Sequence, residues 1–366
     1  NLNIKNINKT KYNYFLFLNN ISQNYNIHEE LCLLLSTSGS TGSKKFVKLS
    51  YENLNSNINA IVKSLNMKKS DSTVTTLPPE YSYGLSVINA HLNIGATIYL
   101  NKFTIFDKKF LEIFDTYKIT NLNGVPFFYD LLKKISFFKK INKKNLKFIT
   151  QAGGAINEDT KNFTLKELKD SNTNFYIMYG STETAPRMSC FNLMKNQNAK
   201  RGCIGLPIGD YKLKIKNNLN NIGKIYFYGK NIFKGYAKNI KNLKSVKNYN
   251  SINTGDLGEL GSDGLYYLRS RSKRIIKISG IRFSLDEIES IIQDKLKNKV
   301  YCSGEDDSLI CYYKNNFLER NSLNLLISKI LKINHKYVKT VKIKNIPFTN
   351  RGKINYEKLR KISEFN

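Results

Sequence analysis

A run of hydroxyl, glycine and lysine residues near the start of the chain has the composition of a phosphate-binding loop. It follows an apolar segment, Cys32–Leu35, and reads Ser36, Thr37, Ser38, Gly39, Ser40, Thr41, Gly42, Ser43, Lys44, Lys45. Glycines let successive backbone N–H groups turn toward an anion, while hydroxyls and a lysine add donors and positive charge. The run lacks the GxxxxGK(S/T) pattern of the common P-loop. It therefore predicts a different kind of cradle for the β- and γ-phosphates of ATP.

Later in the chain, three residues have side chains of types that could contact the other parts of a bound nucleotide. Tyr179 offers a flat ring to a base, Glu183 a carboxylate to Mg²⁺, and Asp256 two acceptors to ribose hydroxyls. Each residue also has an ordinary structural explanation: an aromatic at the edge of the core, a charge at a helix N-terminus, and a Gly-Asp turn. The residue types alone leave both explanations open.

Taken in chain order, these segments resemble the acyl-adenylate-forming superfamily, which includes acyl-CoA synthetases, nonribosomal peptide adenylation domains and luciferases. The first run is similar to the TSGSTGxPK signature of that family, and residues 179–183 match its YGxTE motif. The other similar segments are Leu77–Leu85, Gln151–Ala155, Gly223–Tyr236, Thr254–Asp256, Arg271–Arg282 and Pro347–Ile354. The resemblance extends from about residue 31 to about residue 360, and the fixed order of the motifs makes it specific.

The resemblance implies a role for each motif residue. Besides Thr37 to Gly42 and Lys45, the implied nucleotide-binding residues are Gly154, Ala155, Tyr179, Gly180, Ser181, Asp256 and Arg271. The implied catalytic residues are Lys353, which acts in adenylation, Thr182, which contacts phosphate, and Glu183, which also holds Mg²⁺. The acid pocket is expected to be lined by Tyr81, Tyr83 and Gly153.

The chain also departs from the family pattern at a few positions. Lys44 stands where Pro is usual, Phe46 where Gly is usual, and Ser270 where Gly precedes the ribose-contacting Arg271. The largest departure is at the front, because only 35 residues precede the first run. Either the chain is truncated there or the subdomain that usually precedes this loop is reduced.

Apolar segments that end in glycine-rich loops indicate how the motifs are positioned. The segments that read as buried strands are Cys32–Leu35, Leu146–Thr150 and Phe175–Met178. A helix from Ser50 places apolar side chains on one face, at Leu54, Ile58, Ile61, Val62 and Leu65. Strands and helices that alternate in this way form α/β sheets, which bind ligands at the ends of their strands.

The second half of the chain has a different pattern. Short alternating segments that indicate antiparallel strands are Lys212–Ile215, Lys224–Tyr228 and Leu265–Leu268. Ser284 and Glu287 then form a capping box that begins a helix. We therefore expect an α/β core domain over residues 1–272 with a small antiparallel part. A mobile α+β lid over residues 273–366 would turn about a hinge at Lys273, the position of the hinge in the family.

Composition limits the possible partners. The formal net charge of +31 over 366 residues predicts attraction to polyanions such as ATP, coenzyme A or an acidic carrier protein. Nucleic-acid binders usually concentrate Arg and aromatic residues in one patch, whereas lysine is spread along this chain, so we expect no nucleic acid. No apolar run approaches the roughly 18 residues that a membrane span needs. Five cysteines without a CxxC pattern predict free thiols in a cytoplasmic protein.

Three hypotheses of function follow. The first is a ligase that uses ATP and Mg²⁺ to convert a small carboxylic acid to acyl-AMP and passes the acyl group to coenzyme A or a phosphopantetheinyl carrier protein. The second is an amino-acid-adenylating module, which usually places an Asp near the Tyr81 segment, where this chain has Glu80, Tyr81 and Ser82. The third is a non-catalytic basic binding protein. The sequence determines neither the acid, nor the acceptor, nor the oligomeric state.

Overall fold

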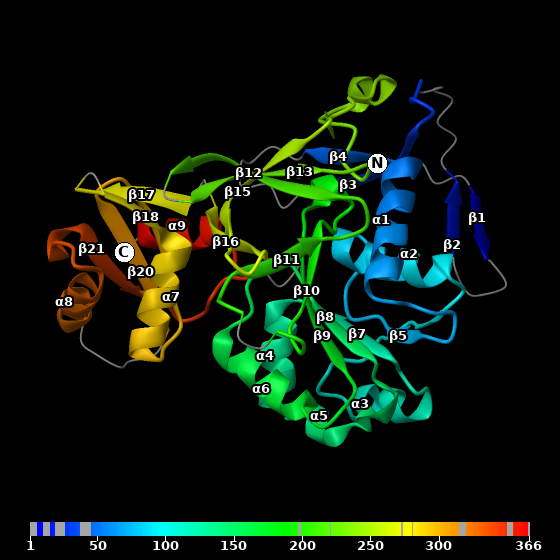
Figure 1. Cartoon of the computed structure of the whole chain (residues 1–366), viewed down its shortest axis with the longest axis horizontal. Helices are drawn as coiled ribbons and strands as arrows, with labels where there is room; N and C mark the ends of the chain where they lie inside the picture. The colour runs from blue at the N-terminus through cyan, green and yellow to red at the C-terminus, as the bar shows by residue number, and fades with distance from the viewer. Residues whose placement is uncertain are drawn as a thin grey trace.

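A computed structural model gives the fold of the chain (Figure 1). It describes residues 6–9, 15–18, 26–36, 45–196, 199–219, 221–271, 274–279, 281–314, 320–349 and 354–364. Over these ranges, no helix combines the length and the apolar character that crossing a membrane would require.

Within the described residues, eleven strands form one continuous sheet whose first five strands are parallel. In spatial order the parallel strands are β6 (Thr97–Tyr99), β5 (Ser72–Val74), β7 (Asn121–Gly124), β8 (Phe148–Gln151) and β9 (Asn174–Tyr179). The predicted strands Leu146–Thr150 and Phe175–Met178 correspond to β8 and β9, although β8 begins two residues later than predicted. The delay arises because Lys143–Asn145 forms a short 3₁₀ helix, η1.

The antiparallel strands continue the same sheet from β9 rather than forming a separate layer. They are, in spatial order, β10 (Ser189–Asn192), β11 (Cys203–Pro207), β16 (Tyr266–Arg271), β15 (Ile252–Leu260), β13 (Ile222–Tyr228) and β12 (Lys212–Leu219). The antiparallel segments predicted from alternation are confirmed: Lys212–Ile215 and Lys224–Tyr228 lie within β12 and β13, and Leu265–Leu268 overlaps β16, which begins one residue later. The mixed α/β architecture with an antiparallel part is therefore confirmed.

Two smaller sheets, helices and 3₁₀ turns complete this part of the described chain. The minor sheets combine β14 (Tyr236–Ala237), β4 (Phe46–Ser50) and β3 (Leu31–Ser36), and pair β1 (Asn6–Lys9) with β2 (Phe15–Leu18). The helices of this part are α1 (Tyr51–Ser64), α2 (Ser82–Asn93), α3 (Lys108–Thr116), α4 (Pro126–Lys134), α5 (Phe137–Lys140) and α6 (Glu158–Leu168), with 3₁₀ turns η2 (Thr182–Thr184) and η3 (Ile240–Lys244).

The predicted helix start at Ser50 is confirmed and has a clear local cause. The Ser50 hydroxyl accepts from the Asn53 backbone N–H at 3.2 Å, and the Asn53 side chain accepts from the Ser50 N–H at 3.0 Å. This reciprocal pair satisfies two donors at the start of α1. The Asn53 amide also donates to the Lys230 carbonyl at 2.7 Å, which fixes α1 against a distant loop.

The C-terminal segment has its own strands, helices and core. Its elements are β17 (Ile275–Ile278), β18 (Ile281–Ser284), α7 (Leu285–Leu296), β19 (Val300–Glu305), β20 (Ser308–Tyr313), α8 (Arg320–Leu331), η5 (His335–Tyr337), β21 (Val338–Lys342) and α9 (Tyr356–Glu364). Figure 1 shows this segment, yellow to red, lying to one side of the helices α1 to α6. Among the described residues, the apolar clusters of the first part end at Leu268 and those of the C-terminal segment begin at Ile276.

A largely enclosed ion-pair cluster joins the elements of the C-terminal segment, with the Arg274 and Glu289 side chains each 12% exposed. The Arg274 guanidinium donates to Asp286 at 2.6 Å, to Glu289 at 2.6 Å and to the Cys302 carbonyl at 3.2 Å. Glu289 also accepts from the Tyr356 hydroxyl at 3.0 Å, so α7, β19 and α9 meet at one arginine. Burial raises the pKa of Glu289 to about 7, while the neighbouring Arg274 opposes this change.

We expect Glu289→Ala to lower the free energy of unfolding by about 3 kcal/mol, because it leaves the buried Arg274 with one carboxylate instead of two. Urea denaturation measures this change. Glu259→Ala is the matched control: Glu259 pairs with Arg269 in a more exposed position, and its loss should cost about 1 kcal/mol or less. Equal losses in the two variants would contradict the assignment.

Candidate nucleotide site

The loops after β8 and β9 bring two predicted motifs to the same edge of the sheet. β8 and β9 are parallel neighbours, so Gly153 and Gly154 lie beside Gly180 at the carboxyl ends of the strands. Gly153 has a φ of 91°, a backbone conformation that favours glycine. The Gln151 amide donates to the Gly154 carbonyl at 2.8 Å and orients the turn, while Gly154 and Ala155 are exposed.

The turn at Gly180 depends on the absence of a side chain. A Cβ atom at this position would lie 1.5 Å from the carbonyl oxygen of Pro186, a backbone atom that cannot rotate away. The chain therefore returns so closely that the Met188 N–H donates to the Tyr179 carbonyl at 2.8 Å. This hairpin fixes the YGxTE motif, Tyr179 to Glu183, against the sheet.

Tyr179 and Asp256, which are implied adenine and ribose contacts, meet directly. The Tyr179 hydroxyl donates to Asp256 Oδ2 at 2.5 Å across 77 residues of sequence. Asp256 is buried, and its backbone N–H donates to the Thr254 hydroxyl at 3.2 Å. The backbone of Arg271 lies opposite Asp256 in the pairing of β15 with β16, so the three residues lie near one another in the fold.

Glu183 and Lys45 are linked through a residue that sequence reasoning did not select. The Tyr236 hydroxyl donates to Glu183 Oε1 at 2.9 Å, and Lys45 Nζ lies 5.7 Å from the centre of the Tyr236 ring. Burial and the adjacent Glu183 carboxylate raise the pKa of Tyr236, which therefore stays a neutral donor. Tyr236 is the last residue of the Gly223–Tyr236 segment that resembles the family. The resemblance therefore included Tyr236 but did not indicate its hydrogen bond to Glu183.

These residues fit a magnesium site that is completed by phosphate oxygens. Mg²⁺ is usually held by one or two carboxylates together with the phosphates of its nucleotide. Glu183 supplies one half-buried carboxylate, and the hydroxyl of the neighbouring Thr182 lies 3.3 Å from that of Ser82. Within the described ranges, no group of three His, Cys, Asp or Glu side chains forms a closed metal cage.

The predicted acid-pocket tyrosines lie in the core next to this site. Tyr81 is 5% exposed and Tyr83 is 2% exposed, and their rings meet edge to face at 6.1 Å. The Tyr83 hydroxyl donates to the Thr150 carbonyl at 2.9 Å, and burial raises its pKa. Tyr83 thus also holds α2 against β8.

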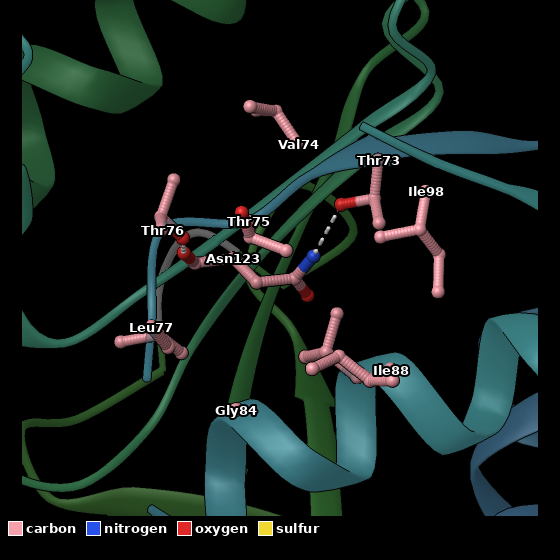
Figure 2. A pocket seen from close by; sticks show the side chains of 10 residues that line it. Thr73, Val74, Thr75, Thr76, Leu77, Gly84, Ile88, Ile98 and Asn123 are labelled. Atoms are coloured by element: carbon pink, nitrogen blue, oxygen red, sulfur yellow. Dashed lines mark hydrogen bonds between the residues drawn. The ribbon is translucent and has the colours of Figure 1, made fainter. Parts of the chain in front are cut away.

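A small pocket lies close to the same segment but does not contain these tyrosines (Figure 2). It is lined by Thr73, Val74, Thr75, Thr76, Leu77, Gly84, Val87, Ile88, Ile98 and Asn123. The dashed line in Figure 2 marks the hydrogen bond from the Asn123 amide to the Thr73 hydroxyl at 3.2 Å. None of the predicted site residues lines this pocket, so it is distinct from the candidate site.

The remaining predicted residues lie outside the described ranges, but the structure describes two residues that flank Lys353. Thr37 to Gly42, Lys273 and Lys353 are not described, and nor is the side chain of Arg271. Phe348 and Ile354, on either side of Lys353, form an antiparallel bridge. The Phe348 ring lies 4.9 Å from that of Phe127 on α4. The residue before Phe127, Pro126, contacts the position that a side chain at Gly154 would occupy.

Comparisons show which known proteins the chain is similar to. The sequence model of the family described as AMP-binding enzyme matches residues 9–237. The chain is 25% identical over 266 residues to the 2-succinylbenzoate–CoA ligase of Lactococcus lactis, covering 72% of this chain and 55% of the relative. It is 26% identical over 270 residues to the oxalate–CoA ligase of Arabidopsis thaliana, and this match covers 71% of this chain and 52% of the relative. The chain thus spans about half the length of these relatives.

Solved structures share the fold. The O-succinylbenzoate coenzyme A synthetase of Bacillus subtilis, in complex with AMP, superposes with a TM-score of 0.74 at 21% identity and covers 91% of this chain and 70% of its own. The McyG A-PCP structure with phenylalanyl-adenylate gives a TM-score of 0.72 at 22% identity. This match covers 98% of this chain and 60% of the McyG chain.

We expect Gly180→Ala to lower the free energy of unfolding by about 4 kcal/mol or to prevent folding, because the added Cβ collides with a backbone carbonyl. Gly154→Ala is the control, since its Cβ would make an ordinary 3.4 Å contact with Pro126 and should change stability by less than about 1 kcal/mol. Thermal and urea unfolding compare the two variants. A Gly180→Ala protein as stable as the parent would contradict this account of the hairpin.

Proposed function

The chain belongs to the family of AMP-binding enzymes, and from that premise we propose that it joins a carboxylic acid to AMP and then transfers the acyl group to a thiol. A carboxylate oxygen attacks the α-phosphorus of ATP, the bond to the bridging oxygen of the β-phosphate breaks, and pyrophosphate leaves. No general base is required, because a carboxylate is already ionised near neutral pH. The product of this first step is an acyl-AMP.

The observation that supports this proposal most strongly is the convergence of three pairs at one sheet edge. Tyr179 contacts Asp256, Tyr236 joins Glu183 to Lys45, and Phe348 packs on Phe127 beside the Gly154 turn. In this arrangement Tyr179 would stack on adenine, and Asp256 would accept from ribose hydroxyls. Glu183 would hold Mg²⁺, which neutralises phosphate charge when bound. The chain's own residues thus fix each end of the nucleotide.

Lys353 is proposed to stabilise the charge that develops on the α-phosphate. A cation aimed at developing charge in a site shielded from water lowers the barrier more than it would in bulk solvent. Support comes from the neighbours of Lys353, because the Phe348–Ile354 bridge closes its loop next to α4. The Asn355 N–H donates to the Pro347 carbonyl at 2.9 Å and tightens the base of the same loop.

The second step is proposed to follow rotation of a lid, residues 273–366, about Lys273. The separate apolar clusters on either side of residue 273 support this division. Contacts between the two parts include the ion pairs Lys299–Asp130 at 2.6 Å and Arg201–Asp294 at 3.4 Å. Such exposed pairs contribute little free energy and break readily, as a moving interface requires.

A thiol acceptor is supported by the relatives, since several are named as CoA ligases. Coenzyme A and a phosphopantetheinyl carrier share the same thiol arm, and both are negatively charged partners for a chain of net charge +31. Amino-acid activation has less support, because Glu80, the acid nearest the Tyr81 segment in sequence, is exposed.

We expect Lys353→Ala to lower ATP–pyrophosphate exchange by about 100-fold or more while the melting temperature stays unchanged. The exchange assay with a panel of carboxylic acids, including amino acids, measures the first step alone. Lys358→Ala removes an exposed lysine from α9 and should leave the rate unaltered. If Lys353→Ala exchanges as fast as the parent, the role given to this lysine is wrong.

We expect Glu183→Gln to raise the Mg²⁺ concentration for half-maximal exchange by about tenfold or more, because an amide binds a hard cation more weakly than a carboxylate. Tyr236→Phe, which removes only the hydroxyl bonded to Glu183, should have a smaller effect. Identical Mg²⁺ dependence in Glu183→Gln and the parent would exclude Glu183 as the metal-supporting residue.

A further inference from the structure

Among the described residues, the largest fully buried side chain is that of Arg187, which the nucleotide site does not use. Arg187 follows Pro186, whose carbonyl faces Gly180, and precedes Met188, which is hydrogen-bonded to Tyr179. It therefore lies just before β10, on the returning segment of the same hairpin that carries the nucleotide motif. Its side chain contacts the sulfur of Met178 on β9.

The charge of Arg187 has no acidic partner in the described part of the chain. The side chains that act on its charge are Tyr83, Cys190 and Tyr81. The guanidinium carbon lies 4.3 Å from the centre of the Tyr83 ring, and Nε has no hydrogen-bond partner. Burial raises the pKa of Cys190 to about 12, so this thiol is neutral. A cation–π contact recovers only part of the hydration that a buried guanidinium loses.

The backbone of Arg187 is nevertheless held by two buried amides. The Arg187 carbonyl accepts from the Asn57 side chain at 2.8 Å and from the Asn231 side chain at 3.1 Å. Both asparagines are fully buried, and Asn231 also donates to the Thr184 carbonyl at 2.5 Å. The backbone that carries this costly buried charge is therefore fixed in place, and such support is what a binding residue requires.

We propose that Arg187 binds a second anionic group of the acid, so that the substrate is a dicarboxylic acid. This inference rests on the proposed function, in which one carboxylate reacts at the α-phosphate. The planar guanidinium matches a carboxylate through two parallel hydrogen bonds. Arg187 also contacts Tyr83, which is predicted to line the acid pocket with Tyr81. Met178 is the neighbour best suited to move aside, because its unbranched side chain adapts easily.

The alternative is that Arg187 only supports the fold, and the two roles predict different behaviour. A structural arginine would be needed for stability whichever acid is bound. A recognition arginine would leave the fold unchanged or more stable when it is replaced by an apolar side chain of similar length, because an unpaired buried charge is removed. In that case the variant would keep its stability but would lose its preference between acids.

The test compares Arg187→Met with the parent in ATP–pyrophosphate exchange, using acids matched in chain length: butanoate with succinate, and hexanoate with adipate. We expect the parent to favour the dicarboxylates in kcat/KM by about tenfold or more, because a buried charge left unpaired penalises the monocarboxylates. Arg187→Met should lose or reverse this preference while the KM for ATP stays the same. Arg269→Met is the control, since Arg269 is paired with Glu259, and it should retain the parental preference.

Thermal unfolding gives a second measurement that does not need turnover. We expect succinate or adipate to raise the melting temperature of the parent and of Arg269→Met, but not that of Arg187→Met. Equal shifts in all three proteins, or the same acid preference in the parent and Arg187→Met, would overturn the assignment. A large loss of stability in Arg187→Met with unchanged preference would assign Arg187 to the fold alone. Absence of exchange with every acid would contradict the proposed function, and the thermal shifts would still decide the role of Arg187.

Discussion

The hairpin that closes over Gly180 is the constraint on which the candidate site depends. A single methyl group at Gly180 would overlap the Pro186 carbonyl, so the chain makes this turn only with glycine. The turn directs Tyr179 and Glu183 toward the nucleotide site and sends Arg187 back into the core. One backbone contact thereby sets the relation between the groups proposed to bind adenine, metal and acid.

Buried asparagine amides hold the segments around this hairpin. Asn53 and Asn57 on α1 reach carbonyls of Lys230 and Arg187, and Asn231 reaches that of Thr184. Irregular backbone leaves carbonyls that no helix or strand satisfies, and leaving such groups unpaired in the interior is costly. An amide can donate to these carbonyls over a gap that backbone alone does not close. These three buried asparagines thus have a structural use at this site.

Local elements were the most predictable part of the structure. The strand at Cys32–Leu35 and the helix start at Ser50 followed from apolar patterning and capping, and both are present. At Ser284 the hydroxyl accepts from the Glu287 N–H at 3.3 Å, which confirms the predicted helix start, although the Glu287 side chain does not complete the predicted capping box. Such signals lie within a few residues of the feature they specify, so a single sequence contains them in full.

The contacts that build the site were less predictable, because they join residues far apart in sequence. Resemblance placed Tyr179 and Asp256 around one nucleotide, but their direct hydrogen bond joins β9 to β15, which three other strands separate in the sheet. Tyr236 reaches Glu183 across 53 residues, and Arg187 gave no signal in composition or periodicity. Burial of an arginine is a property of the folded hairpin and is not encoded by its neighbours in the chain.

Lys45, near the start of the chain, and Lys353, near its end, are proposed to approach the phosphates of the same ATP. An acyl phosphate derivative of ATP transfers its acyl group to lysine amines next to the terminal phosphate, and an acyl-AMP transfers its acyl group to amines next to the α-phosphate. Peptide mass spectrometry identifies the modified lysines. We predict acylation of Lys45 by the first reagent and of Lys353 by the second, with both lysines protected by excess ATP and Mg²⁺. Labelling confined to other lysines, such as the exposed Lys214 and Lys216 on β12, would contradict it.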